Sequence, residues 1–410
     1  MNAKHALMSD NISKGDLNVL VDFLSQDPQP ILTNNKKVKQ FEKEWGHWLT
    51  NDPTNLCMPN NIMVNSGSSA NQITFLSLKQ ILSEGAEVIV PPITWVSDIS
   101  AVLQNGFTPV FCDINPKTLA LDEDQLERKI TGKTKVVFLT HVLGYNGLTD
   151  KILKLCEDND LILVEDVCES HGATFKGKKV GTFGKISNFS FYYAHHMTSI
   201  EGGIVSTNDH EIYQLCRMFR SHGMVREASN DLLKKKYTEE HPDLNPDFIF
   251  AEAAYNFRST EINAVLASNQ LKRLDANNKR RSENYYTFIN GLDPEKFRTN
   301  LNHEGNSNYA FTPILNEPDF ILRDKIEKKL NEFEIEFRRG LSGGGSQIRQ
   351  PYIEKHAKNF NIKINGTYKA PNPLDYPEAD HCHYFGWYIG NYPDLEESKI
   401  KHITEILNED

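Results

Sequence analysis

Residues 161–172 read LILVEDVCESHG, in which the apolar run 161–164 ends in two carboxylates, Glu165 and Asp166. Helix-like stretches, such as 70–83 and 150–158, lie between this run and others of its kind. Strands that are apolar on both faces and alternate with helices predict a mostly parallel sheet covered by helices on both sides. The expected strands are 62–65, 87–90, 109–113, 136–140, 161–166, 188–192 and 204–207.

The remainder of the chain predicts a second, smaller unit. Residues 224–250 are polar and contain proline, which favours an excursion over the surface, most simply a solvated loop. A long helical pattern runs from 260 to 289, and residues 305–410 restart with short strand-like and helix-like segments. Because single cores stop growing at about 250–300 residues, we expect a large domain over 1–275, with an N-terminal arm, and a smaller C-terminal α/β domain over 276–410.

Composition and charge narrow the class of protein. Hydrophobic residues make up 39% and charged residues 24% of the chain, as in ordinary globular enzymes. A formal net charge of −10 argues against a general nucleic-acid or membrane surface but allows a local basic pocket. The first 16 residues lack the apolar core of a signal peptide, and no run approaches the ~20 apolar residues of a membrane helix. We therefore expect a cytoplasmic enzyme.

The cysteines predict neither disulfides nor a sequence-local metal site. They are scattered and form no CxxC or CxC pair. Reduced thiols in a cytoplasmic enzyme are the plain interpretation. The six are Cys57, Cys112, Cys156, Cys168, Cys216 and Cys382.

Two motifs follow expected strands. Residues 65–71, NSGSSAN, open a helix with small residues, so backbone amides and the helix N-terminus can hold an anion; a simple strand–helix turn is the alternative. Asp166 ends the strand 161–166, and the carboxyl ends of strands carry ligands in open α/β sheets. Its carboxylate can hold a protonated ring nitrogen, the arrangement that makes pyridoxal phosphate an electron sink. A helix N-cap is the alternative role.

Two further motifs complete the pattern. Residues 189–196, FSFYYAHH, bring a serine hydroxyl and two adjacent histidines to the end of another strand. Adjacent side chains rarely point at one ion, and no Cys or Asp pattern completes a metal site. Acid–base chemistry is the better interpretation, since histidine titrates near neutrality. Residues 255–264, YNFRSTEINA, are typical of a capped helix start.

In this order and at these separations, the four motifs resemble the DegT/DnrJ/EryC1/StrS sugar aminotransferase family over nearly the whole chain. The resemblance implies the fold-type I aminotransferase fold and a homodimer with shared active sites. It also implies cofactor contacts: Ser68, Ser69 and Ser190 with the phosphate, Trp95 stacked on the ring, Asp166 with the ring nitrogen, Glu169 near the cofactor hydroxyl, where aminotransferase members usually carry Gln, and Asn256 with the phosphate of the other subunit.

One position departs from the family pattern. The pattern is Ser-Phe-x-x-x-Lys, and here the sixth residue is His195. A lysine amine holds the cofactor covalently and shuttles protons, whereas an imidazole can do only the second. The sequence thus resembles the lysine-free dehydratase branch, which implies non-covalent pyridoxal phosphate or pyridoxamine phosphate and His195 as the catalytic proton shuttle. The choice of His195 over His196 rests on this alignment alone.

The branch also implies a reaction. L-Glutamate supplies the amino group, a nucleotide-diphosphate sugar with a 4-keto-6-deoxyhexose loses its 3-hydroxyl, and ammonia leaves, as in 3,6-dideoxysugar synthesis. Some members carry a two-iron cluster on cysteines that follow an RSHG-like stretch. Residues 220–223 read RSHG here, but residues 223–258 contain no cysteine, so we expect no iron–sulfur cluster, no other metal and no reductase partner.

The sugar nucleotide has a candidate site late in the chain. Residues 337–351, FRRGLSGGGSQIRQP, form a glycine-rich basic stretch. Arginine forks bind phosphate oxygens in pairs, so Arg338 and Arg349 are candidates for the diphosphate; a glycine-rich surface turn is an equal alternative. His196 and His222 are further candidates for substrate contact.

Three other functions stay open on sequence grounds. They are a CDP-sugar 3-dehydrase without its own cluster, an enzyme resembling sugar 3- or 4-aminotransferases, and a non-catalytic relative that only binds cofactor. Asp166, Ser190, Asn256 and His195 together weigh against the last of these.

Overall fold

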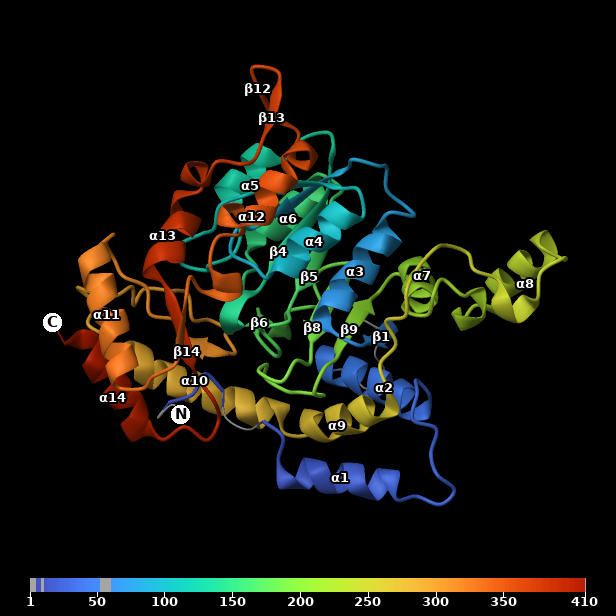
Figure 1. Cartoon of the computed structure of the whole chain (residues 1–410), viewed down its shortest axis with the longest axis horizontal. Coiled ribbons are helices and arrows are strands. Elements are labelled where there is room, and N and C mark those ends of the chain that lie inside the picture. The colour runs from blue at the N-terminus through green and yellow to red at the C-terminus, as the bar shows by residue number, and fades with distance from the viewer. Residues whose placement is uncertain (1–4, 9–10, 52–59, 410) are drawn as a thin grey trace.

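A computed structural model describes residues 5–8, 11–51 and 60–409, so Cys57 lies outside the described residues. Its centre is a seven-stranded sheet in the order β1-β9-β8-β5-β4-β2-β3 (Figure 1). Every predicted strand is present, with its ends displaced by at most two residues. The strands are β1 (Asn60–Val64), β2 (Glu87–Val90), β3 (Thr108–Phe111), β4 (Thr134–Thr140), β5 (Ile162–Asp166), β8 (Ile186–Ser190) and β9 (Gly203–Thr207).

The sheet is mostly parallel, as predicted. Strands β3, β2, β4, β5 and β8 run parallel, and β9 is antiparallel to both β8 and β1. Its side chains alternate between two cores: Val88 and Val90 pack into one, and Ile89 packs into the other. Helices cover both faces, which explains why most residues of the strands are buried.

The helices of the two layers alternate along the chain. The first core takes side chains from α3 (Gly67–Leu78), α4 (Val96–Gln104) and α7 (His210–Arg220). The second takes them from α2 (Lys36–Thr50), α5 (Glu123–Lys129), α6 (Asp150–Asp158) and α9 (Glu261–Leu271). Among the described helices, none is both long enough and apolar enough to cross a membrane.

The C-terminal part forms a smaller α/β unit. Its antiparallel sheet has the order β10-β14-β11, and α10, α11 and α14 lie beside it in Figure 1. The N-terminal arm joins this unit through a bridge from His5 to Ile335. The division at residue 275 stays a proposal. The elements are α10 (Leu274–Gly291), β10 (Ala310–Phe311), α11 (Phe320–Glu332), β11 (Phe337–Arg339), α12 (Pro351–Lys355), β12 (Ile362–Ile364), β13 (Thr367–Lys369), α13 (Pro377–Phe385), β14 (Trp387–Gly390) and α14 (Glu397–Asn408).

Two local predictions are wrong. The single helix expected over 260–289 is two helices, α9 and α10, with Arg273 at the junction. The guanidinium of Arg273 donates to both carboxylate oxygens of Asp16 in α1 (Lys14–Leu24), at 2.8 and 2.6 Å. No proline or glycine marks the junction, so the sequence pattern continues through it.

The excursion over 224–250 is on the surface, but it is not simply a loop. It contains the helix α8 (Asp231–Glu240), which has no buried residue and projects away from the body in Figure 1. The side chain of Asn230 caps its first turn. Lys–Glu pairs four residues apart support a helix on an exposed face, as with Lys235 and Glu239 at 3.6 Å. Two further short strands are β6 (Thr174–Phe175) and β7 (Lys178–Lys179).

Candidate active site

A cavity of about 620 Å³ opens where the parallel strands of the large sheet end. Such edges are where open α/β sheets bind ligands. The large sheet and its helices supply most of its wall, and the C-terminal unit and the N-terminal arm, through Leu7 and Met8, supply the rest. Of the predicted residues, the lining includes Ser68, Trp95, Asp166, Glu169, Ser190, His195 and Arg338.

One end of the cavity suits a phosphate group. Helix α3 begins there, and Ser66 caps it by accepting from the amide of Ser69 at 3.0 Å. The amides of Gly67 and Ser68 lie in the first turn, where a helix offers no acceptor of its own. Gly67 is needed because a Cβ on it would lie 2.6 Å from the Cβ of Ser190. The hydroxyl of Ser69 donates to Asn65 at 2.5 Å, and Ser69 does not line the cavity.

The middle of the cavity has a carboxylate and an aromatic ring. Asp166 is 4% exposed, and its carboxylate accepts from the side-chain amide of Asn71 at 3.0 Å and the backbone amide of Cys168 at 2.9 Å. Trp95 precedes the first turn of α4 and is 55% exposed, so part of its ring is open to a ligand. A carboxylate and an exposed indole can together hold a flat cationic heterocycle.

His195 lines the cavity as a neutral base. Its Nδ1 is 3.3 Å from the carbonyl oxygen of Ser190, which can only accept, so Nδ1 carries the proton and Nε2 keeps the lone pair. Burial lowers the pKa of His195 to about 4; the hydrogen bond to Ser190 and the charge of Asp166 oppose this effect, and the charge of Arg281 adds to it. The imidazole is therefore neutral at physiological pH and able to accept a proton.

Glu169 is a second group that can move a proton. Its carboxylate accepts from the amide of Leu143 and from the hydroxyl of Ser342, both at 2.9 Å. Burial raises the pKa of Glu169 to about 7, against the effect of those two hydrogen bonds. This carboxyl group is thus poised near neutrality inside the cavity.

Two predicted residues are occupied elsewhere in the fold. His196 is buried and does not line the cavity; its Nε2 donates to the carbonyl of Ser307 at 2.5 Å, and its Nδ1 lies 3.4 Å from Nδ1 of His171. Arg349 forms an ion pair with Asp380 at 2.5 Å and lies outside the cavity. The glycine-rich stretch does reach the cavity, through Ser342, Gly343 and Arg338.

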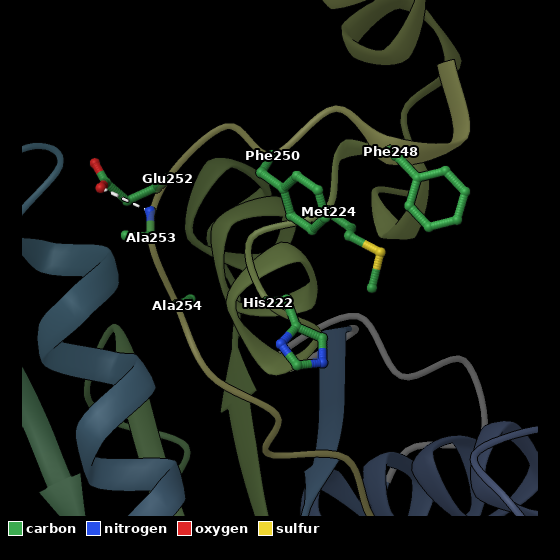
Figure 2. A pocket seen from close by; sticks show the side chains of 7 residues that line it. All are labelled: His222, Met224, Phe248, Phe250, Glu252, Ala253 and Ala254. Atoms are coloured by element: carbon green, nitrogen blue, oxygen red, sulfur yellow. Dashed lines mark hydrogen bonds between the residues drawn. The ribbon is translucent and has the colours of Figure 1, made fainter. Parts of the chain in front are cut away.

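Two more predicted residues lie on a different surface. His222 lines an open hollow of about 680 Å³ beside Met224, Phe248 and Phe250 (Figure 2). Asn256 is exposed and is not part of the first cavity; its side-chain oxygen accepts from the amide of Arg258 at 3.0 Å. Both residues belong to the segment between α7 and α9.

Several lining residues were not predicted. Tyr192 lies inside the motif at 189–196, so proximity to His195 in the sequence was an available signal. Tyr309 and Tyr388 come from the C-terminal unit, and no local pattern marks them, whereas Ser342 lies in the glycine-rich stretch 337–351, of which only the two arginines were singled out. Within the described part of the chain, no lysine lines the cavity.

These groups fit pyridoxal phosphate. Ser68, Ser190 and the start of α3 would hold its phosphate, Trp95 its ring face, and Asp166 its ring nitrogen. The cofactor, when bound, supplies an electron sink for bonds next to the nitrogen that it carries.

Comparison with known proteins shows which family the chain resembles over its length. The model of the DegT/DnrJ/EryC1/StrS aminotransferase family matches residues 22–407. The chain is 30% identical to a GDP-4-keto-6-deoxy-D-mannose 3-dehydratase of Yersinia pseudotuberculosis over 409 residues, 98% of this chain and 97% of the relative. It is 31% identical to a GDP-perosamine synthase of Escherichia coli O157:H7 over 355 residues, 84% of each chain.

Solved structures show the same fold. The E. coli GDP-4-keto-6-deoxy-D-mannose-3-dehydratase with bound hydrated PLP has a TM-score of 0.84 at 26% identity and covers 99% of this chain and 100% of its own. A GDP-4-keto-6-deoxymannose-3-dehydratase with a trapped PLP-glutamate geminal diamine has a TM-score of 0.81 at 26% identity, with 98% and 100% covered. The predicted aminotransferase fold is thereby confirmed. The match of the family model to nearly the whole length shows that this chain belongs to the DegT/DnrJ/EryC1/StrS aminotransferase family.

Proposed function

We propose that the protein is a pyridoxal-phosphate-dependent 3-dehydratase of a nucleotide-linked 4-keto-6-deoxyhexose. The observation that carries this proposal is His195 in the cavity at the position of the family's lysine, with no lysine among the described lining residues. The 3-dehydratase names of similar proteins support it. We propose GDP as the nucleotide for the same reason.

Each polar side chain of the cavity has a separate role in the proposed reaction. His195 is the base, and its Nε2 takes the proton whose removal allows the sugar to lose its 3-hydroxyl. Glu169, with a pKa of about 7, is placed to hold or return a proton within the same cavity. Asp166 keeps a negative charge toward the ring nitrogen. Arg338, which lines the cavity from β11, is a candidate for the diphosphate.

The proposed co-substrate is L-glutamate. Glutamate would supply the amino group and two electrons and would leave as 2-oxoglutarate, and the cavity would hold pyridoxamine phosphate as the amino form of the cofactor. The sugar exchanges its 3-hydroxyl for hydrogen, and ammonia is released. A cavity without lysine favours release over aminotransfer, because a lysine amine is what would displace an amino sugar from the cofactor. The cofactor is held without a covalent bond to the chain.

We also propose a homodimer with shared active sites. Asn256 and His222 lie outside the cavity of their own chain, on the segment that also exposes Phe248 (56%) and Phe250 (53%). Aromatic side chains of this kind are enriched in interfaces between subunits. In such a dimer Asn256 would reach the phosphate end of the partner's cavity.

The test uses purified protein loaded with pyridoxal phosphate and supplied with glutamate. GDP-, CDP- and dTDP-linked 4-keto-6-deoxyhexoses are compared, and 2-oxoglutarate, ammonia and product mass are measured. We expect one ammonia per 2-oxoglutarate and a product that lacks one oxygen, with the GDP-sugar preferred.

Other outcomes separate the alternatives. An amino sugar without ammonia release would make the protein an aminotransferase. Preference for the CDP-sugar would correct the nucleotide. Bound cofactor whose absorbance does not change with glutamate would favour a non-catalytic relative.

A further inference from the structure

A second aspartate lies behind the one that faces the cavity. Asp98, in the first turn of α4, is fully buried and does not line the cavity. One of its oxygens accepts from the hydroxyls of Thr94 and Thr140, at 2.5 and 2.8 Å. The other accepts from the side-chain amide of Asn71 at 2.8 Å.

The same amide nitrogen bridges Asp98 and Asp166. Asn71 Nδ2 also donates to Asp166 Oδ2 at 3.0 Å, so the two carboxyl oxygens lie within two hydrogen-bond lengths of each other. The amide cannot turn over, because Asn71 Oδ1 accepts from Asn188 Nδ2 at 2.9 Å. Asn188 is fixed in turn by the hydroxyl of Thr74, which donates to its oxygen at 2.9 Å.

Among the described contacts of Asp98, no cation compensates its charge. The titratable groups that interact electrostatically with Asp98 are Asp166 at the end of β5, Cys168 just after it, and Tyr352 in α12. The remaining partners are neutral amides and hydroxyls. Burial first, and then the charge of Asp166, raise the pKa of Asp98 well above its usual range.

We propose that Asp98 is a positioning residue that holds one proton between itself and Asp166. Asp98 is fully buried, and two carboxylates that share one amide donor with no cation between them resist being ionised together. The two threonine hydroxyls occupy one oxygen of Asp98, so the proton belongs on the oxygen that faces Asn71 and Asp166. Asp166 is then the single negative charge of the pair.

The consequence for the site rests on the function proposed above. The neutral carboxyl of Asp98 donates to Asp166 and fixes the plane of its carboxylate, while the charge of Asp166 stays directed at the ring nitrogen of the cofactor. The proton itself is a property of the unloaded protein and can be tested without cofactor or substrate. Failure of the dehydratase assay would therefore leave this test unaffected.

The experiment is infrared spectroscopy of the unloaded protein, with carbon-13 in the side-chain carboxyls of its aspartates. The label separates aspartate from Glu169. Wild type, Asp98→Asn and a matched control, Asp113→Asn, are compared between about pH 5 and 9. Asp113 is also buried, but it accepts from the amides of Glu378 and Ala379 at 3.0 and 2.9 Å.

We expect the wild type to show the C=O stretch of a protonated aspartate at neutral pH, absent from Asp98→Asn and retained in the control. A second variant, Asp166→Asn, keeps the test decisive if Asp98→Asn does not fold. Without the charge of Asp166, the pH at which the band disappears should fall by about one unit or more. The proposal is overturned if the band is missing from the wild type at neutral pH, survives in Asp98→Asn, or titrates unchanged in Asp166→Asn.

Discussion

Lowering the pH from about 7.5 to 5.5 tests whether His195 is a buried neutral base. Burial lowers its pKa to about 4, so the active neutral form is present above that value and is lost only as the pH falls through it. At pH 5.5 such a group is still about 97% neutral, whereas an imidazole with the reference pKa of about 6.5 is roughly one-tenth neutral. At pH 5.5 a buried His195 and an ordinary imidazole should therefore differ about tenfold in the rate of proton transfer.

Glu169 has to be removed from the measurement, because burial raises its pKa to about 7, within the tested range. The assay is therefore run on Glu169→Gln beside the wild type. Each protein is loaded with pyridoxal phosphate and mixed with saturating glutamate, and the loss of aldehyde absorbance is followed in a single turnover. At saturation the pH profile reports groups in the complex, not in free glutamate.

We expect the rate of Glu169→Gln to fall less than about twofold between pH 7.5 and 5.5. The rate should fall steeply only near pH 4, because burial lowers the pKa of His195 to about 4. The wild type should show an additional change near pH 7. A tenfold fall by pH 5.5 in Glu169→Gln, with circular dichroism showing folded protein, would refute the claim that His195 is held neutral by burial.

Three further predictions concern the proton shuttle, the phosphate site and the absence of iron. His195→Lys should retain cofactor through denaturing dialysis after borohydride treatment, and it should form some amino sugar. It should lose most of its dehydratase activity, because displacing a proton donor by ~1 Å can lower the rate ~100-fold. His196→Asn should lose less activity than His195→Lys, and the reverse order would assign the proton shuttle to His196. Gly67→Ala should weaken pyridoxal phosphate binding about tenfold or more in an absorbance titration, since its Cβ would meet Ser190 and Cys168 at 2.6 and 3.0 Å; equal affinity would contradict the phosphate site. Anaerobically purified protein should contain no stoichiometric iron or sulfide, and finding both would show a cluster that the cysteine pattern does not reveal.

The sequence predicted most of the fold because its strands are marked locally. Apolar runs bounded by turn residues located all seven strands of the large sheet within two residues. The break between α9 and α10 escaped prediction because no proline or glycine marks it, and the ion pair of Arg273 with Asp16 at the junction joins residues far apart in the chain. Contacts of this kind leave no mark on helical periodicity.

Some residues of the site were predictable from the sequence and others were not, for the same reason. Asp166, Ser190 and His195 were predictable because each ends a strand or follows one closely, at the edge where parallel sheets bind ligands. Tyr309 and Asp98 were not, since one enters from the C-terminal unit and the other acts through Asn71. Chemistry at strand ends is visible in a sequence, whereas the groups that tune it become visible only in three dimensions.

For His195 to act as the base at the position where the family has a lysine, an imidazole at the right place is not enough. The base must be neutral and correctly oriented, and the carbonyl of Ser190 sets its tautomer. Arg281 lies fully buried nearby, and its charge lowers the pKa of His171, His195 and His196 alike. The same burial and the same charge would also favour the neutral amine of a lysine at position 195. The surroundings therefore supply a neutral base for either side chain, and the covalent bond that only lysine can form is what distinguishes the two chemistries.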